Sequence, residues 1–184
     1  WQVPVEETAR VVRQAIEAGY TSIDTAQGYD NEEGVGQGIR DAGADRSKLF
    51  ITSKLRTRDQ PFDAAIKSFE GSLERLGLDY LDMFLIHWPV PKHEMYPDAW
   101  KAFIRLQQEG RVKSIGVSNF LPAHIERILQ ETGVKPVINQ IEVHPEYQQL
   151  EVRDFHKRHD IAIESYSPLG SGAVLDNPVI GEIA

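Results

Sequence analysis

The sequence contains no cysteine among its 184 residues. A chain without cysteine can form neither a disulfide nor a thiolate metal site, and this is consistent with a cytoplasmic location. The sequence also lacks an apolar run of roughly 18 residues and a basic-then-apolar leader, so we expect no membrane partner. The spacing of His93, His124, His156 and His159 does not suit metal ligation, and no metal site is expected.

Positive charge is also in short supply. The 20 lysines and arginines stand against 28 aspartates and glutamates, which gives a formal net charge of −8. This balance argues against nucleic acid or an anionic membrane surface as the main partner. It remains compatible with a phosphate-bearing cofactor, because backbone N–H groups and one or two basic side chains can build a phosphate site.

Short β-branched segments alternate with stretches of helical periodicity along the whole chain. The strand-like segments lie near residues 21–26, 49–54, 80–87, 113–117, 137–143 and 161–166. The helical stretches are residues 5–18, 63–76, 97–109, 121–130 and 148–159. This alternation predicts an α/β fold with an all-parallel sheet and crossover helices.

Four chemically active side chains lie at or just beyond the ends of the first three strand-like segments. They are Asp24, Tyr29, Lys54 and His87. The carboxyl ends of several strands carry the chemistry in a (β/α)8 TIM barrel. A doubly wound sheet would instead need a glycine-rich phosphate loop after its first strand, and residues 34–38 (GVGQG) lie inside a helical segment. The barrel is therefore the predicted architecture.

Six segments resemble the aldo-keto reductase family, in the order that the family shows. They are residues 23–32 (IDTAQGYDNE), 50–55 (FITSKL), 85–89 (LIHWP), 114–120 (SIGVSNF), 139–147 (NQIEVHPEY) and 164–170 (ESYSPLG). The resemblance is greatest to a bacterial branch with 2,5-diketogluconate reductases and broad-range aldehyde or methylglyoxal reductases. Two positions depart from it: Arg56 stands where many relatives carry Trp, and Tyr166 stands where some diketogluconate reductases carry Trp.

The four strand-end residues suit the reduction of a carbonyl group. A free tyrosine, with a pKa of about 10, is a poor acid at neutral pH, but a nearby ammonium stabilises its phenolate. We expect Lys54 to supply that ammonium to Tyr29, the proton donor, and Asp24 to keep Lys54 charged. His87 would donate a hydrogen bond to the carbonyl oxygen. The resemblance implies the same roles, although each residue taken alone could be a cap, a packing aromatic or a structural histidine.

A nicotinamide site is predicted at the later strand ends. We expect Ser118, Asn119 and Gln140 to hold the carboxamide and Tyr166 to offer a flat face to the ring. Ser118 and Asn119 could also cap the helix that follows, either in place of this role or together with it. The resemblance implies that Ser167, Leu169 and Ser171 follow the pyrophosphate. Trp1 and Trp88 are candidates for the wall of the substrate pocket, although Trp1 could be disordered.

The expected function is the NADPH-dependent reduction of an aldehyde or ketone to an alcohol. NADPH follows from the resemblance, and NADH stays open. The substrate could be a keto sugar acid or a methylglyoxal-like aldehyde. The alternatives are a non-catalytic nicotinamide-binding subunit on the same barrel and a non-redox barrel enzyme that uses Lys54 as a Schiff-base amine.

The resemblance also bears on completeness. A closed barrel needs eight strands, and the sequence predicts six. We therefore expect residues 1–184 to form a single barrel domain that is truncated at both ends. One strand would precede Trp1, and the part that grips the adenosine phosphate would follow Ala184. Members of this branch are monomers, so a monomer is expected.

Overall fold

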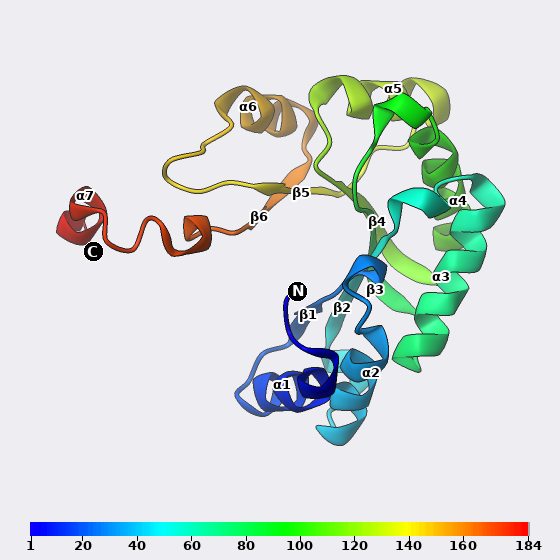
Figure 1. The fold of residues 1–184 in the computed structure, drawn as a ribbon. Helices are drawn as coiled ribbons and strands as arrows, with labels where there is room; N and C mark the ends of the chain where they lie inside the picture. Colours follow the sequence, from blue (N-terminus) through cyan, green and yellow to red (C-terminus); the bar gives the residue numbers. More distant parts are fainter. Residues whose placement is uncertain (184) are drawn as a thin grey trace.

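A curved parallel sheet forms the centre of the computed structural model, which describes residues 1–183 (Figure 1). Within these residues its six strands are β1 (Ser22–Asp24), β2 (Phe50–Leu55), β3 (Leu81–Ile86), β4 (Val112–Ser118), β5 (Ile138–Glu142) and β6 (Ala162–Tyr166). They lie in chain order, and every neighbouring pair is parallel. This arrangement is part of a (β/α)8 barrel, as predicted.

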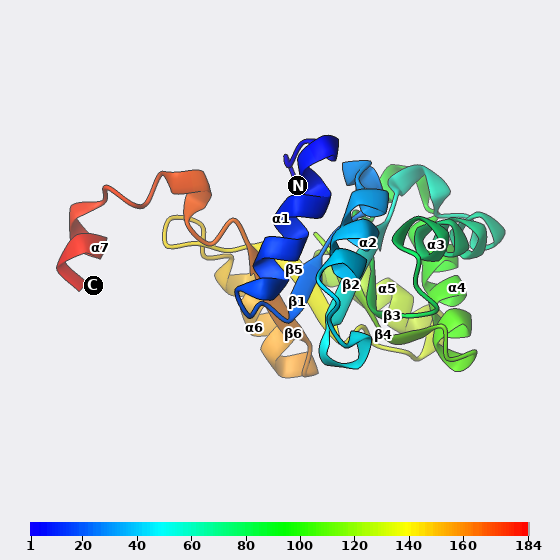
Figure 2. The same cartoon turned by 90° about the horizontal axis from the view of Figure 1, so that it is seen from below.

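The helices are α1 (Val5–Glu17), α2 (Glu32–Asp41), α3 (Phe62–Leu76), α4 (Tyr96–Gln108), α5 (Pro122–Thr132), α6 (Leu150–His159) and α7 (Pro178–Ile183). Helix α1 precedes β1, the helices α2 to α6 follow later elements along the chain, and α1 to α6 lie on the outer side of the curved sheet, whereas α7 lies apart from it (Figures 1 and 2). The six predicted strands and the five predicted helices are confirmed, with helix ends that differ by two residues or fewer. No helix in residues 1–183 is long and apolar enough to span a bilayer.

The core lies between the sheet and the helices α1 to α6, and its aromatic part lies between β3, α3 and α4. All six residues of β3 are buried, as expected for a strand with neighbours on both edges and covered faces. The Phe84 ring lies 5.0 Å from that of Phe69 on α3 and 4.6 Å from that of Phe103 on α4, centroid to centroid. Aromatic packing of this kind fixes the positions of β3 and therefore of the residues at its end.

A buried carboxylate ties the strands together at their amino ends. Asp82 of β3 accepts hydrogen bonds from the backbone N–H of Ile51 (2.9 Å) and from Lys113 (2.8 Å), and it pairs with Arg46 at 2.7 Å. Burial raises the pKa of Asp82, but the bonds from Lys113, Ile51 and Arg46 outweigh burial and hold the pKa below its ordinary value. This network lies at the opposite end of the strands from the residues singled out above.

The glycine-rich stretch of residues 34–38 belongs to α2 and serves helix packing. A methyl group at Gly36 would collide with the backbone carbonyl of Leu76, at the end of α3. A methyl group at Gly38 would come within 2.6 Å of the carbonyl oxygen of Ala9 on α1. The glycines therefore let three helices approach closely, which is why the pattern does not mark a phosphate loop.

Replacement of Gly36 tests this packing. Gly36→Ala should lower the free energy of unfolding by about 1–3 kcal/mol, because the collision with Leu76 forces the α2 and α3 helices apart. Gly71→Ala, in the middle of α3, is the control: the added methyl meets no backbone and only the far end of one side chain, Nη1 of Arg75 at 3.1 Å, so the change should cost much less than Gly36→Ala. Urea unfolding measures both. Equal effects of the two substitutions would contradict the account.

Candidate active site

The first three strands bring the four predicted residues to one rim of the sheet. Asp24 is the last residue of β1, and Tyr29 ends the short 3-10 turn η1 (Gln27–Tyr29) that follows it. Lys54 lies one residue before the end of β2, and His87 directly follows β3. Because the strands are parallel, their carboxyl ends meet at this rim.

The ammonium group of Lys54 is the centre of the cluster. Its side chain is only 1% exposed. Its Nζ donates to a carboxylate oxygen of Asp24, to the backbone carbonyl of Thr25 at 3.0 Å and to the phenolic oxygen of Tyr29 at 3.4 Å. A lysine ammonium has three N–H donors, so all three find an acceptor. The charge is buried but fully paired.

The contact with Lys54 determines the direction in which Tyr29 can donate its hydroxyl hydrogen. The phenolic oxygen accepts a hydrogen bond from Lys54, which leaves its own hydrogen free for another acceptor. The Tyr29 ring meets the ring of His87 edge-on, at 5.8 Å between centroids. Both rings line the same cavity. The phenol can therefore give a proton to a group bound beside His87.

Asp24 links the cluster to the far side of the curved sheet. One carboxylate oxygen pairs with Lys54, and the other accepts a hydrogen bond of 2.9 Å from the side-chain amide of Gln140 on β5. The same amide nitrogen donates to Glu164 of β6 at 3.0 Å. β1 and β5 are not neighbours in the sheet, so this contact crosses the concave face. Gln140 thus lies beside the acid/base cluster.

His87 is neutral over the physiological pH range. Burial and, to a smaller extent, the nearby charge of Lys54 lower the pKa of its imidazole to about 4, against the opposing effect of Asp24. A neutral imidazole keeps one N–H donor. His87 can therefore donate a hydrogen bond without carrying charge.

The residues predicted to hold a nicotinamide form a connected group at the end of β4 and on β5 and β6. Ser118 donates to the backbone carbonyl of Gln140 at 2.8 Å. Asn119 donates to the backbone carbonyl of His87 at 3.0 Å and accepts from the phenol of Tyr166 at 2.9 Å. The alternative that Ser118 and Asn119 cap the following helix is wrong.

The beginning of α5 uses another residue instead. The first free backbone N–H, at Leu121, donates to Nδ1 of His124 at 3.1 Å. Burial holds the pKa of His124 below its ordinary value, so its ring is neutral and can accept this bond. Ser118 and Asn119 therefore do not cap α5, and both lie among the residues that line the cavity.

A buried pair behind the rim holds the loop that carries Ser118 and Asn119. The side chain of Asn139 donates to the carbonyl of Phe120 at 2.8 Å and accepts from its N–H at 3.3 Å. Nε2 of His156 lies 2.9 Å from the Asn139 amide nitrogen. Burial lowers the pKa of His156, so its neutral ring can accept this bond. These contacts connect α6 to the site.

The cavity at this rim has a volume of about 670 Å³. Its lining residues are Trp1, Asp24, Gly28, Tyr29, His87, Trp88, Ser118, Asn119, Gln140, Glu164, Ser165, Tyr166 and Ser167. Trp1, 71% exposed, and Trp88, 47% exposed, are both among the lining residues, and their contact with a substrate stays a prediction. Leu169 and Ser171 are not among the lining residues, so their contact with a pyrophosphate stays a prediction.

Glu164 is a lining residue that sequence reasoning did not single out. It precedes Tyr166 by two positions on β6, and residues two apart in a strand share a face. That spacing could have identified it. No group of histidine, aspartate and glutamate side chains suited to a metal ion occurs in residues 1–183.

The polar side chains that line the cavity suit an aromatic ring that carries an amide. Ser118, Asn119 and Gln140 offer hydroxyl and amide groups within the cavity, and the hydrogen bond to Asn119 fixes the ring of Tyr166. Their N–H and O–H groups already donate within the chain, but their oxygens keep lone pairs that can accept from the N–H groups of a carboxamide. A nicotinamide therefore fits the residues present.

Comparison with known proteins identifies the class. The model of the aldo/keto reductase family matches residues 1–182. The chain is 49% identical to an aldo-keto reductase of Mycolicibacterium smegmatis and 50% identical to the methylglyoxal reductase DkgA of Salmonella typhimurium. Each alignment covers 100% of this chain and 67% of the relative.

Solved structures agree. A mutant of Gox0644 in complex with NADPH superposes with a TM-score of 0.95 at 48% identity, over 100% of this chain and 66% of that one. These matches define an oxidoreductase on a TIM barrel. The chain belongs to the aldo/keto reductase family, whose members are NADPH-dependent carbonyl reductases. It spans about two thirds of the length of these relatives.

The protonation of His87 can be measured directly. The ring signals of His87 in an NMR titration should stay constant between about pH 8 and about pH 5.5 and then move near pH 4. The spectrum of His87→Gln assigns the signals. A His87 midpoint close to the ordinary value of about 6.5 would contradict the environment described here.

Proposed function

We propose that this protein reduces the carbonyl group of a small aldehyde or ketone to an alcohol, with NADPH as the hydride source. The contact of the Lys54 ammonium with Asp24 and Tyr29 at the cavity wall carries the proposal. The glyoxal reductase of Bacillus subtilis, 48% identical over 178 residues, and the methylglyoxal reductase DkgA support it.

In this proposal Tyr29 gives the proton. Its hydroxyl hydrogen is free because the oxygen already accepts from Lys54. When the proton leaves, the positive charge of Lys54 stabilises the phenolate. Asp24 keeps Lys54 protonated despite its burial, since it supplies a counter-charge at hydrogen-bond distance.

His87 orients the substrate in this proposal. Its neutral imidazole would donate its N–H to the carbonyl oxygen and stabilise the negative charge that develops there. A charged imidazolium would compete with Tyr29 as the acid, so the low pKa of His87 keeps the two roles separate.

A bound nicotinamide cofactor would supply the hydride, which no side chain can supply. Ser118, Asn119, Gln140 and Tyr166 would hold its amide-bearing ring, and Ser167, Leu169 and Ser171 would follow its pyrophosphate. NADPH is preferred to NADH in this proposal because Gox0644 and the Bombyx mori reductase are solved with NADPH and NADP.

The charge of the cavity favours an uncharged substrate. Asp24 and Glu164 are the carboxylates among the described lining residues, and no lysine or arginine joins them there. Lys54, just below the lining, neutralises Asp24, whereas Glu164 has only an amide as partner. We therefore favour a methylglyoxal-like aldehyde over a keto sugar acid. A monomer in the cytoplasm completes the proposal.

Removal of one hydroxyl tests the proton donor. In the complete natural polypeptide, Tyr29→Phe should lower kcat about 10²–10⁴-fold, the range that a general acid contributes. The dissociation constant of NADPH, from fluorescence titration, should stay the same. Tyr20→Phe makes the same chemical change on an exposed tyrosine and should have no effect. A Tyr29→Phe protein with the wild-type rate would refute the assignment, and a wild type that binds NADPH but reduces no aldehyde would refute the function.

A matched pair of aldehydes tests the charge argument. Wild type should prefer 4-nitrobenzaldehyde to 4-carboxybenzaldehyde in kcat/KM. Glu164→Gln should shift this preference toward the carboxylate by about 3–10-fold, because it removes a like charge from the cavity. Glu151→Gln, at an exposed position on α6, is the control. An unchanged ratio in Glu164→Gln would show that Glu164 does not set the charge preference.

A further inference from the structure

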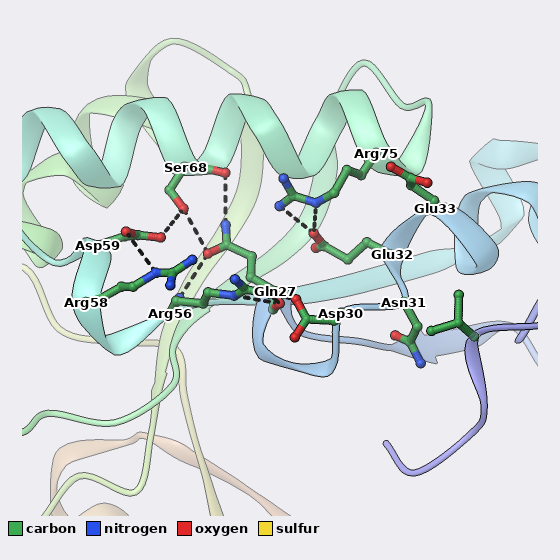
Figure 3. A pocket seen from close by; sticks show the side chains of 11 residues that line it. Gln27, Asp30, Asn31, Glu32, Glu33, Arg56, Arg58, Asp59, Ser68 and Arg75 are labelled. Carbon is green, nitrogen blue, oxygen red and sulfur yellow. Dashed lines mark hydrogen bonds and ion pairs between the residues drawn. The ribbon is translucent and has the colours of Figure 1, made fainter.

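We propose that a buried polar clamp positions the proton donor from behind, on the face of β2 that points away from the active-site cavity. The clamp consists of Gln27 and Glu32 with their partners Ser53, Arg56, Ser72 and Arg75. Figure 3 shows Gln27, Glu32, Arg56 and Arg75 of this set. Gln27 and Glu32 flank Tyr29 in the chain, and we call residues 27–32 the Tyr29 turn. This inference rests on the proposed function, because it assigns positioning residues to that chemistry.

Gln27 is the first anchor of the Tyr29 turn. It is 2% exposed. Its amide nitrogen donates to the carbonyl of Ser68 (2.9 Å) and to the hydroxyl of Ser72 (2.8 Å) on α3. Its amide oxygen accepts from the N–H of Arg56 (2.9 Å) and from the hydroxyl of Ser68 (2.9 Å). An amide side chain has two donors and two acceptor lone pairs, and all four are used.

Glu32 is the second anchor. Its side chain is 1% exposed. One carboxylate oxygen accepts from the hydroxyl of Ser53 on β2 (2.6 Å). The other accepts from Nε of Arg75 (2.8 Å) and from the hydroxyl of Ser72 (3.2 Å). Ser72 therefore touches both anchors, so the two ends of the Tyr29 turn share one partner on α3.

Arg56 adds a third connection, to the backbone of the turn itself. Its Nε donates to the carbonyl of Gln27 at 2.7 Å, and its terminal nitrogen reaches the same carbonyl and the carboxylate of Asp30. The guanidinium of Arg56 thus holds Gln27 and Asp30, which lie on either side of Tyr29 in the chain. Figure 3 shows these side chains converging between α3 and the turn.

The cavity in Figure 3 is a by-product of this clamp. It measures about 390 Å³ and is lined by three arginines, which would suggest an anion site. Each arginine, however, is already paired with a carboxylate of the chain. The pairs are Arg56 with Asp30, Arg75 with Glu32, and Arg58 with Asp59 at 3.8 Å. Arg56 and Arg75 hold the turn through these pairs and Arg58 is paired with its neighbour, so we assign no ligand to this cavity.

One strand holds Tyr29 from two sides. Successive side chains of a strand point to opposite faces, so Lys54 points into the barrel while Ser53 points outward. Lys54 contacts the phenolic oxygen, Ser53 contacts Glu32, and the N–H of Arg56 contacts Gln27. The distance between ammonium and phenol is therefore set by the register of the turn against residues 53–56. The clamp should govern kcat and leave cofactor affinity alone, because Ser118, Asn119 and Tyr166 belong to other strands.

The test uses the complete natural polypeptide and the variant Gln27→Leu, which removes the amide at similar size. Amide hydrogen exchange in the peptide that spans residues 26–33 should become faster. kcat and kcat/KM for 4-nitrobenzaldehyde should fall together, by about 10–100-fold, as expected when a reacting group is displaced by about 1 Å. The dissociation constant of NADPH should stay within about 2-fold.

Two further variants separate positioning from general loss of stability. Ser53→Ala should lower kcat in the same way, and Ser53→Thr, which keeps the hydroxyl, should restore it. Asp82→Asn breaks the buried network at the other end of the same strands. It should lower the melting temperature but leave kcat unchanged in the folded protein.

The outcomes are distinct. An active wild type with a fully active Gln27→Leu variant would overturn the clamp, whether or not exchange changed. An equal loss of kcat in Asp82→Asn would also overturn it, because the effect would then be one of stability. If wild type binds NADPH but reduces no aldehyde, the proposed function fails instead. In that case unchanged exchange in Gln27→Leu would refute the clamp as well.

Discussion

A buried ammonium must find an acceptor for each of its three hydrogens, and at Lys54 this requirement organises the site. The acceptors come from the end of β1, from the backbone after it and from the turn η1. A lysine with 1% exposure would otherwise carry a large desolvation cost. The third acceptor is Tyr29, whose own hydrogen is thereby left for the cavity. The same hydrogen bond therefore completes the pairing of the Lys54 ammonium and leaves the Tyr29 hydroxyl hydrogen free to be donated.

This arrangement depends on strand order. β1, β2 and β3 are adjacent and parallel, so their carboxyl ends deliver carboxylate, ammonium and imidazole to one rim. The curvature of the sheet then brings Gln140 of β5 to Asp24 across the concave face. The aromatic packing of β3 against α3 and α4 supports the rim from behind. α3 thus serves twice, because it also carries the serine and arginine partners of the Tyr29 turn.

Much of the fold is readable from the sequence because its elements are marked by local patterns. The apolar run of β3 and the glycine that ends α3 are such patterns, and helix α3 begins and ends within one residue of its predicted bounds. The four strand-end residues could be singled out because parallel strands end at a common edge. A helix over residues 34–38 could also be predicted, because these residues lie inside a segment with a local helical pattern.

The contacts between distant residues could not be predicted in this way. The bond from Gln140 to Asp24 joins positions 116 apart, and that from Gln27 to Ser72 joins positions 45 apart. Ser118 and Asn119 were open to a capping role because the local sequence suits it, but His124 takes that role in three dimensions. The spacing of Glu164 and Tyr166 on one strand indicates a shared face, but the bond between Glu164 and Gln140 of the next strand is a contact of the fold that no local pattern marks.

The central claim concerns the positions of hydrogens at Lys54 and Tyr29, and neutron crystallography of a deuterium-exchanged crystal observes them directly. We expect three deuterons on Nζ of Lys54, directed at Asp24, the carbonyl of Thr25 and the phenolic oxygen. The deuteron of Tyr29 should point into the cavity beside His87. A neutral amine at Lys54, or a Tyr29 deuteron directed at Nζ, would contradict the account.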